Sequence, residues 1–443
     1  MDPNLLQDLV KAALKSGADA AEAVGAERRS LSIGVRLGAL EEVEREEVAE
    51  IGLRVFVGQR TAVVAGSNLS TDARARLVER AVAMARLAPE DRFSGLAPPE
   101  RLARGPFPDL DLFDPSEPEA ADLESLALAA EEVARATPGV ANSEGGGASW
   151  ADSGWTFVTS TGFEGRQRAS SFSLSASVIA GEGDKMERGG EGRTTRHRSD
   201  LPTPEAIGAE AGRRAVGRLN PRTLASQSAP VIFENRLAMS VLSPMIGAIS
   251  GAAVARGVSF LKDKLGSALF TPDITISEAP HRIRGLGSGA FDDEGVATTA
   301  RKLIDRGALT TWLMNVASAN QLGLETTGHA SRGLAGAPGV ATHNLTLEPG
   351  TDDLAALMRG AGRGLLVTSM FGPSLNSNTG DWSVGVGGFW FEEGEVAYPV
   401  SGVTVAGNLI DIYGRLVAGS DLELRGSANA PSILVDALAI AGK

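Results

Sequence analysis

The first 220 residues alternate between helix-like and strand-like patterns. Apolar residues recur at helical spacing from Leu5 to Leu14 and predict an amphipathic helix. Alternating and β-branched runs over 30–67 predict an antiparallel meander, and a similar pattern returns over 140–179. The polar stretch 181–199 is interpreted as a hairpin end or loop. Three further segments have helical spacing: 70–88, 118–136 and 204–219. Strands followed by a helix therefore occur twice, a hint of structural repetition.

The composition changes near residue 229. A short strand over 230–233 leads into a long helix of small residues, predicted from about 235 to 256. Strands and glycine-rich turns dominate the remainder: 303–309, 344–347, 382–391 and 393–397. The pattern predicts a two-domain α+β protein, with the boundary near Ser226–Ser228. Residues 1–225 would form strand meanders with packed helices, and residues 226–443 a mainly antiparallel sheet with one long helix.

Composition and charge exclude several classes of protein. The chain has 55 acidic and 42 basic residues, a net charge of −13, which argues against binding to a nucleic-acid backbone. It has no cysteine, so disulfides, iron–sulfur clusters and a cysteine nucleophile are excluded. No window approaches the ~20 apolar residues of a membrane span, and the N-terminus lacks the features of a signal peptide. We therefore expect a cytoplasmic protein without membrane or nucleic-acid partners.

The four histidines do not form a zinc-peptidase motif. Such a motif places two histidines one helical turn apart with a glutamate beside them, and here no histidine has another within five positions. Arginines flank His197, and His281 follows a proline. His329 and His343 lie in turn-like sequences. Each histidine is expected to lie at the surface or to be hydrogen-bonded rather than to bind a metal.

Two acidic groups are candidate cation sites. Asp292, Asp293 and Glu294 precede Gly295, but they lack the alternate oxygen spacing of a calcium loop. A tight turn with exposed carboxylates is the preferred interpretation. The second group is expected to be a solvated strand face: Glu41, Glu42, Glu44, Glu46, Glu47 and Glu50.

Glycine-rich segments offer no firmer site. The run Gly285–Gly289 lacks the preceding strand and following helix of a nucleotide-binding loop. Glycines interrupt the strand 382–391, which is interpreted as a bent core strand, although pairing with an extended peptide or a partner's strand stays open. A polar loop before it fits turn chemistry: Asn376, Asn378, Thr379 and Asp381. The residues alone therefore predict no catalytic, cofactor-binding or metal-binding side chain.

Several blocks nevertheless occur in a characteristic order in the C-terminal half: Ser243–Gly247 (SPMIG), Gly257–Gly266 (GVSFLKDKLG), Phe291–Gly295 (FDDEG), Leu303–Gly307 (LIDRG) and Gly380–Val386 (GDWSVGV). The run Val55–Gly58 (VFVG) supports the same match in the N-terminal half. In these blocks the chain resembles the TldD/PmbA family, and specifically its PmbA branch, also called TldE. The resemblance covers essentially the whole chain.

The resemblance implies a cytoplasmic bacterial protein that pairs with TldD as a metallopeptidase. The complex degrades unfolded or short peptides and trims leader sequences from peptide antibiotics, and the older family label is modulator of DNA gyrase. In TldD, a zinc helix carries H-E-x-x-x-H about fifteen residues before the block that begins here at Gly257. Those positions fall on Leu242, Ser243 and Gly247, none of which can bind zinc or activate water. Pro244 is also expected to disturb the helix.

Three hypotheses follow. The leading one is a non-catalytic subunit, without zinc of its own, that completes a chamber around the zinc site of a TldD-type partner and admits unfolded or extended peptides. The second is a metal-free homodimer that binds peptides or another protein, as a regulator related to gyrase or to toxin–antitoxin systems. The third is an independent hydrolase whose metal site combines Asp292, Asp293 and Glu294 with a histidine.

Overall fold

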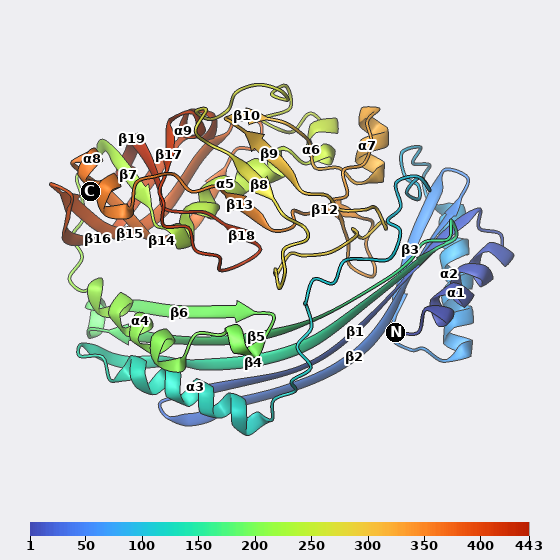
Figure 1. The fold of residues 1–443 in the computed structure, drawn as a ribbon, viewed down its shortest axis with the longest axis horizontal. Helices are drawn as coiled ribbons and strands as arrows, with labels where there is room; N and C mark the ends of the chain where they lie inside the picture. Colours follow the sequence, from blue (N-terminus) through green and yellow to red (C-terminus); the bar gives the residue numbers. More distant parts are fainter. Residues whose placement is uncertain (443) are drawn as a thin grey trace.

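The computed structural model describes residues 1–442, apart from the side chain at position 184. Figure 1 shows two parts: a long curved sheet with helices on its outer side, and a C-terminal half of smaller strands and helices lying across the other side of that sheet. Helices and strands are intermixed in both halves, which confirms the predicted α+β class.

The N-terminal half is built on one six-stranded antiparallel sheet. Its strands follow the order β3-β2-β1-β4-β5-β6: β1 (Ala20–Arg36), β2 (Ala39–Val57), β3 (Arg60–Gly66), β4 (Val140–Thr159), β5 (Glu164–Ala180) and β6 (Glu187–Thr195). The two predicted meanders are confirmed, and pairing of β1 with β4 joins them into a single sheet. The segment 181–199, interpreted as a hairpin end or loop, is a hairpin end whose second strand, β6, pairs with β5 from Phe172 to Ala180.

Two helix pairs cover the same face of this sheet. They are α1 (Pro3–Lys15) with α2 (Thr71–Leu87), and α3 (Ala120–Arg135) with α4 (Pro204–Gly217). Along β1, Ala23 packs in the core under the first pair and Ile33 in the core under the second. Because side chains alternate along a strand, Val24 points to the opposite face, where it packs with Phe291 from the C-terminal half.

The segment between α2 and α3 straps the two halves together. The guanidinium of Arg101 donates to the Thr326 carbonyl, 2.8 Å away. Further along, the Ser170 amide of β5 donates to the Leu112 carbonyl, so the strap pairs with an edge of the sheet that β6 does not reach. This proline-rich segment has turns and isolated bridges but no helix or strand of its own before it enters α3.

The C-terminal half combines a barrel-like sheet with a smaller one. The larger sheet has the order β16-β15-β14-β7-β19-β17, and extra pairing of β16 with β19 curls it round. Its strands are β7 (Gln227–Phe233), β14 (Arg363–Leu375), β15 (Asp381–Glu392), β16 (Glu395–Asn408), β17 (Leu416–Ala418) and β19 (Ile433–Ala441). The smaller sheet contains β8 (Ile276–Glu278), β9 (Arg301–Asp305), β10 (Ala308–Leu309), β13 (Leu345–Leu347) and β18 (Ala428–Asn429).

Short elements complete this half. A two-stranded ribbon joins β11 (Ala330–Ser331) to β12 (Gly339–Val340). The helices are α5 (Asn235–Ala248), α6 (Gly251–Ala255), α7 (Val316–Leu322), α8 (Leu354–Ala361) and α9 (Leu409–Arg415). Two single turns of 3₁₀ helix, Gly183–Lys185 and Arg198–Asp200, lie in the N-terminal half. Among the described residues, no helix is long and apolar enough to cross a membrane.

Two expectations about the helix after β7 are wrong. The predicted helix 235–256 breaks into α5 and α6, because the backbone at Ser250 pairs with Leu313. Conversely, α5 runs without interruption through Pro244. A proline removes one backbone donor, and here burial of Leu242 and Met245 in the core on either side of it outweighs that loss.

The glycine-interrupted strand is a core strand. Strand β15 is hydrogen-bonded to β14 on one side and to β16 on the other, so it has no free edge for a peptide or a partner's strand. A Cβ at Gly388 would lie 1.9 Å from the Leu366 carbonyl oxygen. The glycines therefore allow close contact with a neighbouring strand of the same chain, and the pairing alternative is wrong.

Candidate functional site

The positions aligned by count with a zinc motif lie on α5 and carry no ligand. Leu242 is fully buried in the main core of the C-terminal half. Ser243 and Gly247 lie on the exposed side of the helix. The Ser243 hydroxyl donates to the Met239 carbonyl of the preceding turn at 2.7 Å, and nothing lies within 4 Å of a Cβ built on Gly247. This helix therefore offers neither a metal ligand nor a general base.

A different set of residues brings metal-binding chemistry together. Glu278 ends β8, His329 precedes β11 and His343 precedes β13. One ligand atom from each lies within 4.8 Å of the others, the only such group of three found among the described residues. The side chains of Glu278 and His329 are 0% and 1% exposed. Two imidazoles and a carboxylate are a donor set that suits zinc.

Hydrogen bonds already occupy this cluster. His329 Nε2 lies 2.7 Å from Glu278 Oε2, and the His343 backbone N–H donates to Glu278 Oε1 at 2.5 Å. The second nitrogen of His329 contacts the Thr327 hydroxyl, and His343 Nε2 contacts the Gly328 carbonyl. A metal would have to replace the bond between His329 and Glu278. The cluster thus fits a metal only after rearrangement, and no catalytic step is derived from it.

Burial and hydrogen bonding shift the pKa of Glu278 in opposite directions. Burial raises the pKa of Glu278, but the hydrogen bond and charge of His329 outweigh it, and the net pKa lies below the ordinary value. Burial lowers the pKa of His343. Glu278 is therefore ionised at neutral pH while His343 is neutral. This arrangement ties β8 to the two turns that carry the histidines.

The acidic triplet is buried, so the prediction of exposed carboxylates is wrong. Asp292 and Glu294 are 3% and 2% exposed. Asp292 accepts backbone N–H bonds from Glu294, Val296 and Ala330, each at 2.9 Å. The turn itself is as predicted, but the strap and the N-terminal sheet cover it, which local sequence could not indicate. Asp293 is partly buried and accepts from the Arg332 amide.

The triplet is held by backbone hydrogen bonds within the fold. Glu294 accepts the Val316 amide at the start of α7, at 2.7 Å. Burial raises the pKa of Glu294 to about 8 and that of Asp292 to about 7. Among the described residues, no histidine gathers with these acids into a group that could hold a metal. The hypothesis of an independent hydrolase based on the triplet therefore lacks its site.

The remaining sequence candidates have structural roles. Each histidine is hydrogen-bonded, as expected: His197 Nε2 to the Asp111 carbonyl at 3.0 Å and His281 Nε2 to the Thr298 hydroxyl at 3.1 Å. In the loop 376–381, Asp381 accepts from the hydroxyl of Thr379, which is turn chemistry. The glutamates of β2 lie on its exposed half.

One buried ion group was not found from sequence. Glu22 of β1 pairs with Arg54 of β2, 3.3 Å away, and with Arg332 from the C-terminal half. All three side chains are at most 2% exposed. Neither this group nor the cluster around Glu278 has a local signal, since the residues that bond to Glu22 and Glu278 come from distant segments, with Arg54 32 and Arg332 310 residues away from Glu22 and His329 51 residues away from Glu278.

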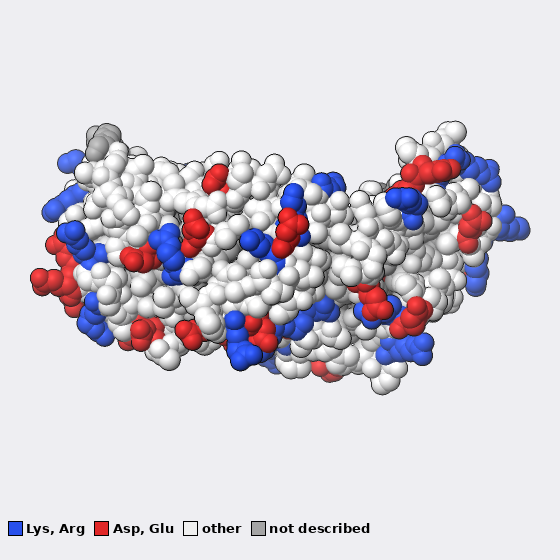
Figure 2. Space-filling view, turned by 90° about the horizontal axis from the view of Figure 1, so that it is seen from above, with Lys and Arg blue, Asp and Glu red and all other residues white. Residues whose placement is uncertain are grey.

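Surface charge gives no sign of a nucleic-acid interface on the face seen in Figure 2. Basic and acidic side chains are interspersed there, with wide uncharged areas between them. A phosphate-binding surface would need clustered Lys and Arg. The charge distribution on the outer side of the C-terminal half and the net charge of −13 therefore both argue against binding to a nucleic-acid backbone.

Comparisons with known proteins cover the whole chain. Family models match residues 226–442 as the PmbA/TldA metallopeptidase C-terminal domain, 113–219 as the central domain and 21–85 as domain 1. "Metalloprotease PmbA" of Escherichia coli O157:H7 is 38% identical over 99% of this chain and 96% of its own length. The homolog from Haemophilus influenzae is 36% identical over 98% of this chain and 94% of its own length.

Solved structures of similar fold also match along nearly the whole chain. A Bacteroides thetaiotaomicron protein named for modulation of DNA gyrase is 27% identical, covers 100% of this chain and 99% of its own, and has a TM-score of 0.93. TldE from Thermococcus kodakarensis shares the fold, with 21% identity, 99% and 100% coverage and a TM-score of 0.88. The matches extend over all parts of the fold described above, and this chain belongs to the PmbA/TldD metallopeptidase family.

Proposed function

We propose that this chain is the non-catalytic subunit of a two-subunit zinc metallopeptidase of the cytoplasm, whose zinc is held by a TldD-type partner. The observation that carries the proposal is the set of Leu242, Ser243 and Gly247 at the positions of the zinc motif on α5. The relatives are named metalloproteases, so the metal and the general base must come from another polypeptide. The substrates proposed are unfolded peptides and the leader sequences of peptide antibiotics.

The free edge of β2 is the surface proposed to meet the partner. Strand β3 pairs with Ile51–Val57, so within the described part of the chain the first half of β2 has a neighbouring strand on the β1 side alone. Leu37, Leu40 and Val43 at this edge are 54%, 46% and 52% exposed. An unpaired edge with exposed apolar side chains is a template for strand addition. The glutamates beside it favour a basic partner strand.

Cleavage by separate and mixed subunits tests the proposal. The full chain and a TldD-type protein from the same genome are purified and incubated, alone and together, with an unfolded peptide and zinc. The mixture is expected to cleave, and native mass spectrometry is expected to show a one-to-one complex with one zinc. Full activity of this chain alone with zinc contradicts the proposal, as does zinc held by this chain and lost in His329→Ala.

The proposed interface has its own test. Leu40→Asp combined with Val43→Asp adds charge to the free edge without touching the core, and it is expected to abolish complex formation. Leu324→Asp, at a residue 48% exposed in the C-terminal half, is the matched control and should leave the complex intact. Equal loss in both variants would show that the edge of β2 is not the contact surface.

A homodimeric regulator is the second candidate, because the same free edge can pair with its own copy about a twofold axis. Some structural relatives are named for modulation of DNA gyrase. Native mass spectrometry distinguishes the candidates. A stable homodimer that excludes the TldD-type protein and changes gyrase supercoiling favours the regulator.

A further inference from the structure

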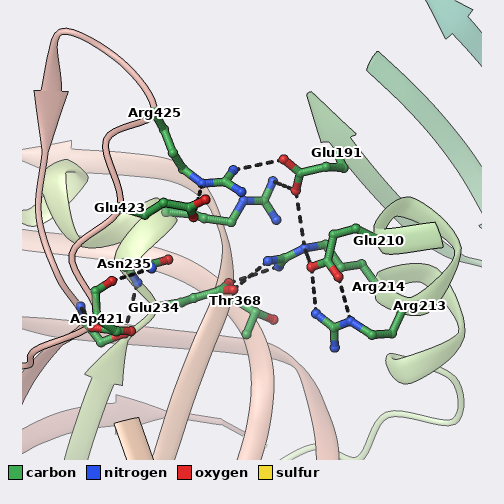
Figure 3. A network of polar contacts seen from close by, with 12 residues as sticks. Glu191, Glu210, Arg213, Arg214, Glu234, Asn235, Thr368, Asp421, Glu423 and Arg425 are labelled. Carbon is green, nitrogen blue, oxygen red and sulfur yellow. Dashed lines mark hydrogen bonds and ion pairs between the residues drawn. The ribbon is translucent and has the colours of Figure 1, made fainter. Parts of the chain in front are cut away.

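A pocket lies where α4 of the N-terminal half meets the barrel-like sheet. Its cavity has a volume of about 350 Å³, at the small end of the range for ligand sites. One wall is apolar and consists of Leu354, Leu366, Phe389 and Val396. The opposite wall carries the guanidinium groups of Arg213, Arg214 and Arg218 at the end of α4, together with the Glu234 carboxylate. Figure 3 shows part of this charged wall with Thr368 beside it.

Two of the guanidinium groups are neutralised by neighbouring carboxylates. Arg213 makes two hydrogen bonds of 2.7 Å to Glu210. Arg214 donates to both oxygens of Glu234, at 3.1 and 2.6 Å, and also lies 2.6 Å from Glu210. The positive charges of Arg213 and Arg214 are therefore already paired with carboxylates of this chain.

Arg218 differs from Arg213 and Arg214 in its hydrogen-bond partners. Its terminal nitrogens donate to the backbone carbonyls of Arg188 and Thr368, at 3.1 and 2.7 Å, rather than to carboxylates. Burial and the charge of Arg214 lower the pKa of Arg218 below its ordinary value, although the charges of Glu187 and Glu234 act in the opposite direction. The Thr368 hydroxyl is buried and has no hydrogen-bond partner among the described residues. A half-buried cation and a threonine with an unused hydroxyl therefore line the same cavity.

We propose that this pocket binds the C-terminal residue of a peptide, with its carboxylate at Arg218 and Thr368 and an apolar side chain against the opposite wall. Charge complementarity selects an anion, and the apolar wall selects one attached to a hydrocarbon group. The volume limits the ligand to about one or two residues. A fatty acid has the same chemistry. The preference for a peptide rests on the proposed function, whereas the pocket can be tested without the partner.

Binding to the isolated full chain is the test. The probe is an N-terminally fluorescein-labelled pentapeptide, Gly-Ser-Gly-Ala-Leu, measured by fluorescence anisotropy with a free or an amidated C-terminus. The free acid is expected to bind at least tenfold more tightly than the amide. Equal affinities, or no binding of either peptide, overturn the proposal. So does binding of decanoate to the pocket without binding of the free-acid peptide.

Variants connect the binding to the pocket. Arg218→Met is expected to weaken the free-acid peptide about tenfold, with partial recovery in Arg218→Lys. Thr368→Val should cost a few-fold. Val396→Asp, at a residue 49% exposed, adds a repelling charge to the wall and keeps the test valid if Arg218→Met does not fold. Arg76→Met, on the exposed face of α2, is the control.

Loss of affinity in the control equal to that in the pocket variants overturns the proposal. Failure here leaves cleavage by the mixed subunits unaffected, so the two proposals fail separately.

Discussion

The two halves of the molecule meet at two charged joints that differ in exposure. The buried joint consists of Glu22, Arg54 and Arg332, whose side chains are at most 2% exposed. The partly exposed joint includes Glu191, Arg214, Glu234 and Arg425, with Glu234 16% and Arg425 23% exposed (Figure 3). Phenylalanine rings lie beside the buried joint, whereas a cavity lies beside the other.

The difference shows what each joint can do. At the buried joint, one carboxylate lies between two guanidinium groups away from water, so each charge depends on its partners. A backbone contact fixes the same region, because a Cβ on Gly52 would lie 2.3 Å from the Leu334 carbonyl oxygen. At the partly exposed joint, water and several carboxylates can replace a lost partner. The first joint therefore fixes the arrangement of the halves more strongly, and the second is expected to tolerate the loss of one partner.

The largest effect is expected from Glu22→Gln. This change removes the carboxylate that Arg54 and Arg332 share, and breaking a buried pair in this way costs about 3–5 kcal/mol. The measurement is the free energy of unfolding from urea titration at pH 7, followed by circular dichroism. A cost below about 1 kcal/mol would show that water reaches the buried joint.

The next effect concerns pH. Burial, and then the charge of Asp292, raise the pKa of Glu294 from 4.5 to about 8. The folded chain thus holds this proton more tightly than the unfolded chain. Its stabilisation is complete below pH 4.5 and is lost as the pH rises to about 8, at up to ~1.4 kcal/mol per pH unit. Asp292 acts in the same direction.

Glu294→Gln mimics the protonated form and keeps an acceptor for the Val316 amide. Its free energy of unfolding, measured from pH 5.5 to 8.5, is expected to fall less steeply with pH than that of the unchanged chain. Identical slopes for the two proteins would mean that Glu294 does not titrate in this range.

The regular elements could be predicted because their signals are local. The N-cap Ser70, whose side chain accepts from the Ala73 amide, marks the start of α2 in sequence and in structure. Alternation over 171–178 likewise predicts the buried face of β5. Pairing of β1 with β4 was not predicted, since no local pattern says which meander edges meet.

For the candidate site, the sequence predicts one property, which is the lack of a zinc motif on α5. Leu242, Ser243 and Gly247 are visible in the sequence once the family blocks set the register. His329 and His343 lie 51 and 65 residues after Glu278 in the chain, so no local pattern indicates that the three side chains meet. The burial of Asp292 was mispredicted for the same reason, because the covering residues come from distant segments.

A smaller effect is expected from Glu234→Gln at the partly exposed joint. Arg214 loses one charged partner but keeps Glu210 at 2.6 Å, and Glu191 lies 3.8 Å away. The expected cost is about 1–2 kcal/mol, less than for Glu22→Gln. The same urea titration measures it. A cost equal to that of Glu22→Gln would mean that both joints are equally inaccessible to water.

The smallest effect is expected from Glu90→Gln, which removes the pair with Arg60 at the surface of the N-terminal half. The two atoms lie 3.1 Å apart, closer than Arg54 and Glu22, but the side chains are 42% and 65% exposed. Water and salt screen such a pair, so the expected cost is about 0–1 kcal/mol and falls further in 0.5 M salt. The three variants together test whether the cost of removing a carboxylate falls as the exposure of the ion pair rises. If Glu90→Gln costs as much as Glu234→Gln, exposure does not explain the difference between the joints, and the surrounding packing must.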